Sequence, residues 1–399
     1  MTTVSDRSVT VTNRPTREQL ERIYDILDEC FAVGKAFFQA RLDRDRAYDP
    51  DTTWFATVDG EIAANVQIFP LSIRVGRSVL KTGAMGSVGT APQYRGMGLA
   101  HQILDAQTTY MRETDYDISV LLASKHAFYE KAGWRLIPET AYSIEKPVNS
   151  EQQSNYDIIP FEPRYLDEIR AIYVQYNRNR TYTVVRNEAY WNDLMNWPEW
   201  NKSDCLLLLR SGKVAAYGMI DKKDSEQVFI HEVLYLDEAA DGVEHLFHAL
   251  CRLRPNAKHI AAMLPEDHIL YSYYQQHHAQ AFQIRTAMWK MINLQSTFHK
   301  LQPELEQRLI GHESLTDQPL HIALRCGEDQ IYLDYMDKRL SVSDVSHSHA
   351  YVPLAIDERN LIDAIMFGYQ AADASMDHAA VLQALFPKQQ AVFYSADRF

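Results

Sequence analysis

The chain has 399 residues, of which 46% are hydrophobic and 23% are charged. These are ordinary values for folded domains and exclude a mainly disordered chain, and the length predicts two or three domains. The formal net charge of −13 opposes binding to nucleic acid or to an anionic membrane surface.

Apolar runs are short throughout the sequence. The longest, Cys205–Leu209 and Ile260–Leu264, fall far short of the roughly 20 residues of a membrane helix. Residues 1–10 lack the apolar core of a signal peptide, so we expect a cytoplasmic protein. The four cysteines lie far apart, and no histidine pair has a Cys or carboxylate at metal-site spacing. We therefore expect neither a disulfide framework nor a metal site.

Residues 1–150 alternate helices and strands. Thr16–Ala32 is predicted to be a helix, because Thr16 suits the N-cap and apolar side chains follow at helical spacing. Asp59-Gly60 predicts a tight hairpin. The other expected elements are strands over Thr53–Val58, Ile62–Pro70, Ser72–Val75, Lys81–Thr90 and Ile118–Ala123, and helices over residues 97–113 and His126–Ala132.

A polar stretch, Val148–Asn155, has the composition of a linker and precedes a second segment, residues 151–295. This segment repeats the element order of the first with almost no residue identity, which makes it a weak internal repeat. Its expected elements are helices over Glu162–Asn179 and Asp241–Leu253, and strands over Cys205–Arg210, Val214–Ile220 and Gln227–Leu236.

Residues 296–399 follow a different pattern and are expected to form a separate α+β domain. The whole chain is thus predicted to be α/β (α+β), with two mixed-sheet units followed by this domain. Its expected elements are helices over Leu301–Leu309, Glu358–Phe367 and Met376–Phe386, and strands over Leu320–Cys326, Gln330–Met336, Leu340–Ser343, Tyr351–Ile356 and Ala391–Tyr394.

The most informative stretch is Gly86–Ala100, which reads GSVGTAPQYRGMGLA. A strand ends here, a turn follows at Pro92, and a glycine-containing turn opens a helix. Glycines in a first helical turn allow a ligand to approach closely, and the helix N–H groups together with the Arg95 cation suit a pyrophosphate. Neither a Walker A loop nor a full G-x-G-x-x-G is present, so nucleotide-binding loops of those classes do not fit.

The pattern V-x-T-x-P-x-Y-R-G-x-G-L-A resembles the acetyl-CoA-binding motif of the GNAT acetyltransferases. The resemblance implies acetyl-CoA as the co-substrate and no metal. It also implies that the strand end meets the pantetheine arm and that the turn and helix start hold the pyrophosphate. The implied cofactor-binding residues are Val88, Gly89, Thr90, Arg95, Gly96, Met97, Gly98, Leu99 and Ala100, with Ser124 and Lys125 downstream.

Downstream, Ala123–Trp134 reads ASKHAFYEKAGW, a strand end and a short helix that stops at Gly133. An isolated tyrosine on a helix is more commonly a packing residue. In GNAT enzymes, however, a tyrosine in this element lies beside the CoA sulfur, which implies Tyr129 as the general acid to the departing thiolate. Because tyrosine has a pKa of about 10 and a thiol of about 8.5, this proton transfer is uphill by about 2 kcal/mol.

The order of the three segments resembles that of the Eis (enhanced intracellular survival) acetyltransferases. The resemblance implies a catalytic GNAT domain at residues 1–150, a degenerate GNAT-like domain at 151–295 and a sterol-carrier-protein-like domain at 296–399, assembled as a hexamer. In that family the terminal carboxylate of a phenylalanine is the base, which implies this role for Phe399. An α-carboxyl pKa of about 3.5 makes a weak base, so burial or a bridging water has to assist it.

Asp237 and Glu238 stand in the second segment where the first has its glycine-rich turn. Carboxylates repel a pyrophosphate, so we expect one active site per chain, with the second unit structural or lining a substrate channel.

The implied function is acetyl-CoA-dependent N-acetyl transfer to primary amines, with aminoglycosides or other polyamino compounds as acceptors. An acidic chain suits such polycations. A protein lysine as the acceptor, a non-catalytic CoA-binding sensor, and a lipid-binding module lined by Tyr351–Ile356 and Leu361–Phe367 stay open as alternatives. Candidate channel residues are Asp25, Glu29, Phe37, Phe38 and Trp197.

Overall fold

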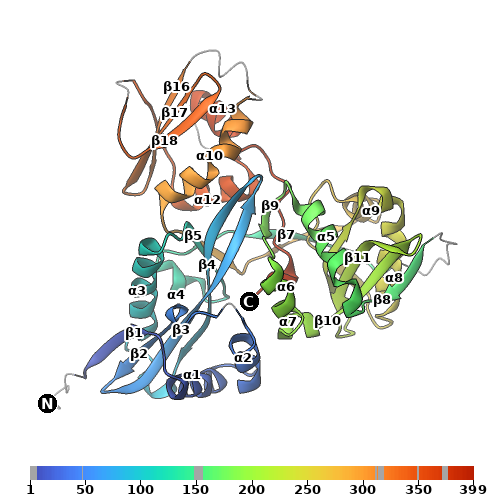
Figure 1. Ribbon diagram of the computed structural model, residues 1–399, viewed down its shortest axis with the longest axis horizontal. Coiled ribbons are helices and arrows are strands. Elements are labelled where there is room, and N and C mark those ends of the chain that lie inside the picture. The colour runs from blue at the N-terminus through green and yellow to red at the C-terminus, as the bar shows by residue number, and fades with distance from the viewer. Residues whose placement is uncertain are drawn as a thin grey trace.

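The computed structural model describes residues 7–46, 48–147, 156–310, 312, 319–347, 350–370 and 376–399. The predicted linker at Val148–Asn155 lies outside the described residues. Three sheets of eight, seven and four strands, with helices packed on them, form a mixed α/β fold (Figure 1). The predicted fold class is confirmed. None of the helices in these ranges combines the length and hydropathy needed to cross a membrane.

The first sheet has the order β1-β2-β3-β4-β5-β15-β6, and β9 pairs with β3. All neighbouring strands are antiparallel except β4 and β5. Because successive strand residues point to opposite faces, Phe69 shares a core with α1 on one face and Ile68 shares a core with α3 on the other. The strands are β1 (Val9–Asn13), β2 (Thr53–Val58), β3 (Glu61–Val75), β4 (Ser78–Thr90), β5 (Ile118–Leu122), β6 (Arg135–Leu136), β9 (Thr181–Val184) and β15 (Ala287–Met291), and the helices are α1 (Arg17–Cys30), α2 (Lys35–Leu42), α3 (Leu99–Glu113) and α4 (His126–Glu130).

Local sequence signals explain the start of α1 and the length of β3. The Thr16 hydroxyl accepts from the Gln19 N–H, and the Gln19 side chain accepts from the Thr16 N–H (3.2 and 2.8 Å), which confirms the predicted N-cap. The two strands predicted around Pro70 are one strand, β3. Pro70 lies between the stretches of β3 paired with β2 and with β9, where that edge has no partner strand, a position that tolerates a residue without an N–H.

The second sheet repeats the topology of the first. Three antiparallel strands are followed by a helix and by a strand parallel to the third: β2, β3, β4, α3 and β5 in the first sheet, β10, β11, β12, α8 and β13 in the second. The order is β14-β7-β13-β12-β11-β10-β8. Its strands are β7 (Glu139–Glu145), β8 (Asp157–Pro160), β10 (Ser203–Arg210), β11 (Lys213–Asp221), β12 (Gln227–Tyr235), β13 (His259–Ala262) and β14 (Gln280–Ile284), with helices α5 (Leu166–Asn177), α6 (Glu188–Leu194), α7 (Pro198–Asn201), α8 (Val243–Arg252) and α9 (Ile269–Gln276).

Each of these two sheets takes a strand from the other half of the repeat. β15 lies between β5 and β6 of the first sheet, and β7 lies between β14 and β13 of the second. Backbone pairing therefore crosses the predicted boundary near residue 150. This boundary and the one near residue 295 stay predictions. We call the first sheet with its helices the first unit and the second sheet with its helices the second unit.

The third sheet, in the order β18-β17-β16-β19, packs with α10, α12 and α13 above the long β3–β4 hairpin (Figure 1). The helix predicted at Leu301–Leu309 begins earlier, at Leu294, because the Asn293 side chain accepts the Ser296 N–H (2.9 Å). The elements are α10 (Leu294–Ile310), β16 (Leu320–Cys326), β17 (Asp329–Met336), β18 (Arg339–Ser343), β19 (Val352–Ala355), α12 (Glu358–Phe367) and α13 (Met376–Leu385).

The strand predicted at Ala391–Tyr394 is wrong. Ala391 forms an isolated bridge to Thr181, and the next three residues are buried without joining a described strand. Phe393 packs into the core of the first unit, whereas Val392 and Tyr394 pack into that of the second. The segment therefore runs between the two units toward a short 3-10 helix, η5 (Ser395–Asp397), and Figure 1 places the C-terminus between them.

Candidate active site

The parallel strands β4 and β5 separate at their carboxyl ends. Their pairing ends at Met85 and Leu121, whereas β4 continues against β3 as far as Thr90. The register of β3 and β4 shifts near Asn65, Ser87 has a φ of 49°, and the Asn65 amide donates to the Ser87 carbonyl (2.7 Å). Such a bulge bends a strand locally, and two cavities adjoin the resulting gap.

The first cavity, of about 460 Å³, lies at the amino-terminal end of α3. Gly96 and Gly98 have φ values of 85° and 74°, and a Cβ added at either would have no neighbour within 4 Å. Open space therefore surrounds this turn, at a helix end whose first N–H groups lack partners within the helix. The predicted residues that line the cavity are Val88, Thr90, Arg95, Gly96, Gly98, Leu99, Ala100, Lys125 and Tyr129.

Three predicted cofactor-binding residues do not line this cavity. A Cβ at Gly89 would lie 2.9 Å from the Asn65 side-chain oxygen and 3.0 Å from the Leu27 side chain, so Gly89 allows α1 to pack on β4. Met97 packs against the hydrophobic cluster around α3, and Ser124 lies in the turn before α4. A contact between their backbones and a cofactor stays a prediction.

Cys30 and His101 line the same cavity and were missed by sequence reasoning. The Cys30 thiol and the Arg95 guanidinium both donate to the Thr90 carbonyl (3.3 and 3.2 Å). The His101 ring lies 4.2 Å from the Phe128 ring. His101 directly follows the motif, so its place in the first turn of α3 was a usable signal, whereas Cys30 is brought there only by the packing of α1 on β4.

Tyr129 lies where the two cavities meet, since it lines both of them together with Phe31 and Val88. The Phe128 ring packs edge-on against it at 4.9 Å. Burial raises the pKa of Tyr129 above its ordinary value. Its hydroxyl therefore keeps its proton at neutral pH and can act as a donor.

The second cavity, of about 550 Å³, lies between the first and second units. Its wall contains five phenylalanine rings, from Phe31, Phe37, Phe38, Phe69 and Phe399. The rings of Phe69 and Phe399 are 6.1 Å apart. The polar and charged residues of its lining are Arg41, Ser87, Lys202, Asp221, His231, Ser395 and Arg398.

The predicted channel residues divide into two groups. Phe37 and Phe38 line the second cavity, and the other three do not. Asp25 and Glu29 form ion pairs with a lysine (2.6 Å) and an arginine (3.5 Å) at the surface. Trp197 is buried with an arginine guanidinium 3.5 Å above its ring. The ion pairs of Asp25 and Glu29 therefore engage these two side chains away from the cavity.

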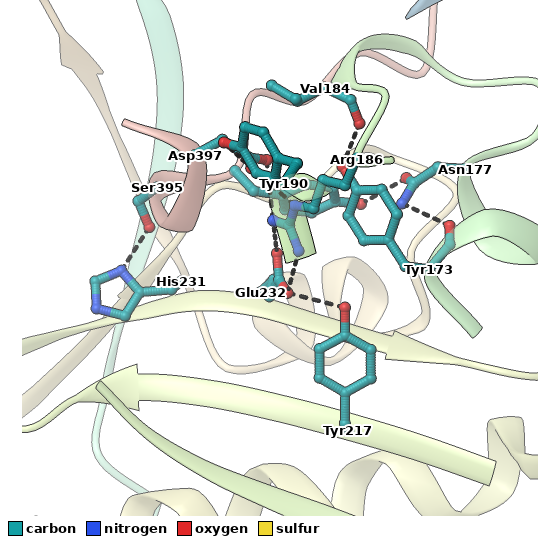
Figure 2. A network of polar contacts seen from close by, with 11 residues as sticks. Tyr173, Asn177, Val184, Arg186, Tyr190, Tyr217, His231, Glu232, Ser395 and Asp397 are labelled. Carbon is teal, nitrogen blue, oxygen red and sulfur yellow. Dashed lines mark hydrogen bonds and ion pairs between the residues drawn. The ribbon is translucent and has the colours of Figure 1, made fainter. Parts of the chain in front are cut away.

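A buried network joins the end of the chain to the second unit (Figure 2). Arg186 forms ion pairs with Glu232 (2.6 Å) and Asp397 (2.7 Å), and all three side chains are fully buried. Two tyrosine hydroxyls donate to the two carboxylates at 2.8 and 2.9 Å. The network holds η5, so it also positions Ser395 and Phe399 at the second cavity.

Comparison with known proteins agrees with this geometry. Residues 12–137 match the acetyltransferase (GNAT) domain family. No curated protein matches the chain. Three solved structures share the fold over 98% of this chain and 100% of their own: a protein of Enterococcus faecalis V583 described as "Probable N-Acyltransferase" (15% identity, TM-score 0.77), a GCN5-related N-acetyltransferase from Anabaena variabilis ATCC 29413 (15%, 0.70) and Eis1 from Mycobacterium abscessus (12%, 0.67).

Proposed function

We propose that this chain, whose residues 12–137 form an acetyltransferase (GNAT) domain, transfers the acetyl group of acetyl-CoA to a primary amine. The observation that carries the proposal is the position of Tyr129 between two cavities of different character. The first cavity surrounds an open helix N-terminus, which suits a pyrophosphate. The second has an aromatic wall and suits an organic acceptor.

The residues of the first cavity fit acetyl-CoA, which supplies an acetyl group activated as a thioester. The N–H groups of residues 96–100 and the Arg95 side chain would hold the pyrophosphate, because no atom of the described residues lies within 4 Å of a Cβ built on Gly96 or Gly98. β4 beyond Met85 no longer pairs with β5, so the backbone of Val88–Thr90 has an edge without a described partner strand on which to hold the pantetheine arm. The Thr90 carbonyl on this stretch already accepts from the Cys30 thiol and the Arg95 guanidinium.

Tyr129 would donate its proton to the departing thiolate. Its raised pKa keeps the phenol protonated but makes the transfer more uphill than for an exposed tyrosine. The proton therefore has to move together with thiolate departure. The carboxylate of Phe399 stays the predicted base, and the Phe399 ring in the cavity wall is compatible with that role.

The lining of the second cavity favours an amine with an apolar or aromatic body. The described lining holds one carboxylate side chain, Asp221, beside Arg41, Lys202 and Arg398. A polycation is recognised through several carboxylates. The prediction that aminoglycosides and other polyamino compounds are acceptors therefore depends on the net charge of the whole chain. A protein lysine stays the alternative acceptor.

We also propose an Eis-type organisation, with a sterol-carrier-protein-like domain over residues 296–399. The shared fold with Eis1 from Mycobacterium abscessus over 98% of this chain supports it. Assembly as a hexamer stays a prediction, which light scattering on the purified chain would measure.

The test is thiol release from acetyl-CoA with 2-phenylethylamine, an aminoglycoside, a lysine peptide or no amine. We expect release that depends on 2-phenylethylamine, and a kcat about 10² to 10⁴ lower in Tyr129→Phe. Tyr110→Phe, on α3 and packed against Trp54, is the matched control and should leave kcat unchanged. Binding of acetyl-CoA without thiol release in the presence of any of these amines would overturn the proposal in favour of a CoA sensor. A variant with residues added after Phe399 tests whether the Phe399 carboxylate is the base.

A further inference from the structure

Three polar side chains lie in a row in the lining of the second cavity: Asp221 at the end of β11, His231 on β12 and Ser395 at the start of η5. Nδ1 of His231 lies 2.6 Å from the Ser395 hydroxyl (Figure 2). Nε2 of the same ring lies 3.0 Å from Oδ1 of Asp221. This is a charge contact, because Nε2 has no hydrogen-bond partner among the described residues. The row has the acid, imidazole and hydroxyl of a proton-transfer chain.

The charge on Asp221 decides where the imidazole proton lies. The Phe229 N–H donates to Oδ2 of Asp221 (2.7 Å). Burial acts to raise the pKa of Asp221, but the contact with His231 and this N–H outweigh it, so the pKa lies below its ordinary value. An ionised carboxylate beside Nε2 favours the proton on that nitrogen. Nδ1 is then an acceptor, and the Ser395 hydroxyl must donate to it.

Other charged groups near His231 are already engaged. Glu232, the next residue, and Asp397, two residues after Ser395, are both paired with Arg186. Arg398 is paired with Glu139 (2.6 Å). Lys202 and Arg41 also line the cavity and add positive charge to it.

An acceptor amine arrives as an ammonium ion and has to lose a proton before its nitrogen can attack a thioester. Histidine, with an ordinary pKa of about 6.5, is closer to neutral pH than an α-carboxyl at about 3.5. An imidazole is therefore the better base under neutral conditions.

We propose that Ser395 and His231, in place of the predicted Phe399 carboxylate, remove this proton from the acceptor amine. The ammonium proton passes to Oγ of Ser395 while the Ser395 hydroxyl proton passes to Nδ1 of His231, which leaves a neutral amine, an unchanged serine and an imidazolium beside Asp221. The nitrogen lone pair then forms the C–N bond as the C–S bond breaks, and Tyr129 protonates the sulfur. The second nitrogen proton returns to Tyr129, and the imidazolium releases its proton to solvent.

This inference rests on the proposed function, so its test uses two aromatic acceptors of similar size that differ in whether their nitrogen is protonated at neutral pH. 2-Phenylethylamine is protonated at neutral pH, whereas an arylamine such as 4-methylaniline is not. We expect His231→Gln and Ser395→Ala to lower kcat/KM by about 10² or more for 2-phenylethylamine and by less than about threefold for the arylamine. Retained arylamine acetylation shows that the variant is folded and that its cofactor site is intact.

The pH profile gives a second readout. For the unchanged chain, kcat with 2-phenylethylamine should fall toward acid pH, where a protonated base no longer accepts the ammonium proton, and this fall should be absent with the arylamine. The control His259→Gln, at an exposed position on β13, should leave both profiles unchanged. Equal losses for the two amines in His231→Gln, or full activity of Ser395→Ala on 2-phenylethylamine, would overturn the relay.

A readout without substrate separates this inference from the proposed function. Nitrogen NMR of the imidazoles, with the His231 signal assigned through His231→Gln, should show the proton on Nε2 and a hydrogen-bonded Nδ1 that shifts in Ser395→Ala. A proton on Nδ1 would contradict the relay even if the chain acetylates amines. Failure to acetylate either amine would overturn both the proposed function and the relay. The NMR result would still establish the hydrogen bond between Ser395 and Nδ1 of His231.

Discussion

Arg186 and Asp397 are 211 residues apart in the chain and form an ion pair of 2.7 Å in which neither side chain is exposed. Arg186 follows β9, which joins the first sheet through β3, and its guanidinium lies 4.1 Å from the Tyr173 ring. Asp397 belongs to η5 at the end of the chain. Ser395 and Phe399, which line the second cavity, therefore depend for their positions on this buried ion pair with a residue from the middle of the chain.

We expect Arg186→Met to destabilise the protein by about 3 to 5 kcal/mol, because it leaves two buried carboxylates, Glu232 and Asp397, without their cation. Lys258→Met is the matched control: it breaks a pair with Glu226 whose side chains are 66% and 77% exposed, so its effect should stay below about 1 kcal/mol. Urea unfolding measures both. Similar shifts of the midpoint in the two variants would show that the buried network does not hold this segment.

A substitution in the glycine turn should separate binding from stability. Gly98→Ala and Gly212→Ala both place a Cβ at positive φ (74° and 78°) with no neighbour within 4 Å, so the backbone strain of about 1 to 2 kcal/mol is the same. Only Gly98 faces the first cavity. We expect calorimetry to show acetyl-CoA binding weakened about tenfold or more, equal to about 1.4 kcal/mol, in Gly98→Ala alone. Comparable affinities in the two variants would remove this turn from the cofactor site.

The second unit should not bind a second cofactor. Asp237 and Glu238 are exposed in the 3-10 turn before α8, the position that corresponds to the open glycine turn before α3. Two carboxylates there oppose a pyrophosphate, so titration calorimetry should give one acetyl-CoA per chain. A second binding event that persists in Gly98→Ala would contradict this assignment.

Acid should weaken the fold through His268. This side chain is buried, its Nδ1 accepts the Leu270 N–H (3.0 Å), and burial lowers its pKa to about 4. The unfolded chain takes up this proton at an ordinary pKa of about 6.5. The folded state then loses up to about 3 kcal/mol as the pH falls from about 6.5 to about 4.

Unfolding free energies measured across that pH range test the assignment. The slope should be smaller in His268→Gln and unchanged in His259→Gln, which alters an exposed histidine. If His268→Gln keeps the full slope, another group is responsible for the acid sensitivity.

Sequence alone determined the features that depend on neighbours a few residues apart. The capping box at Thr16, the Asp59-Gly60 hairpin, the open turn at Gly96 and Gly98, and the short helix that carries Tyr129 all follow from backbone preferences and local hydrogen bonds. For that reason most residues of the first cavity were predictable from one continuous motif. Cys30 was not, because its place depends on how α1 packs.

Tertiary structure alone decided the second cavity. Asp221 and His231 lie on paired strands, and Ser395 joins them through contacts distant in sequence, among them the pairing of Arg186 with Glu232 and Asp397. The exchange of β7 and β15 between sheets, and the burial of Ala391–Tyr394 between two cores instead of in a strand, have the same origin. These outcomes depend on which distant surfaces bury one another. Local sequence patterns do not determine which distant surfaces pack together, because the same apolar residues can form a strand or a buried loop.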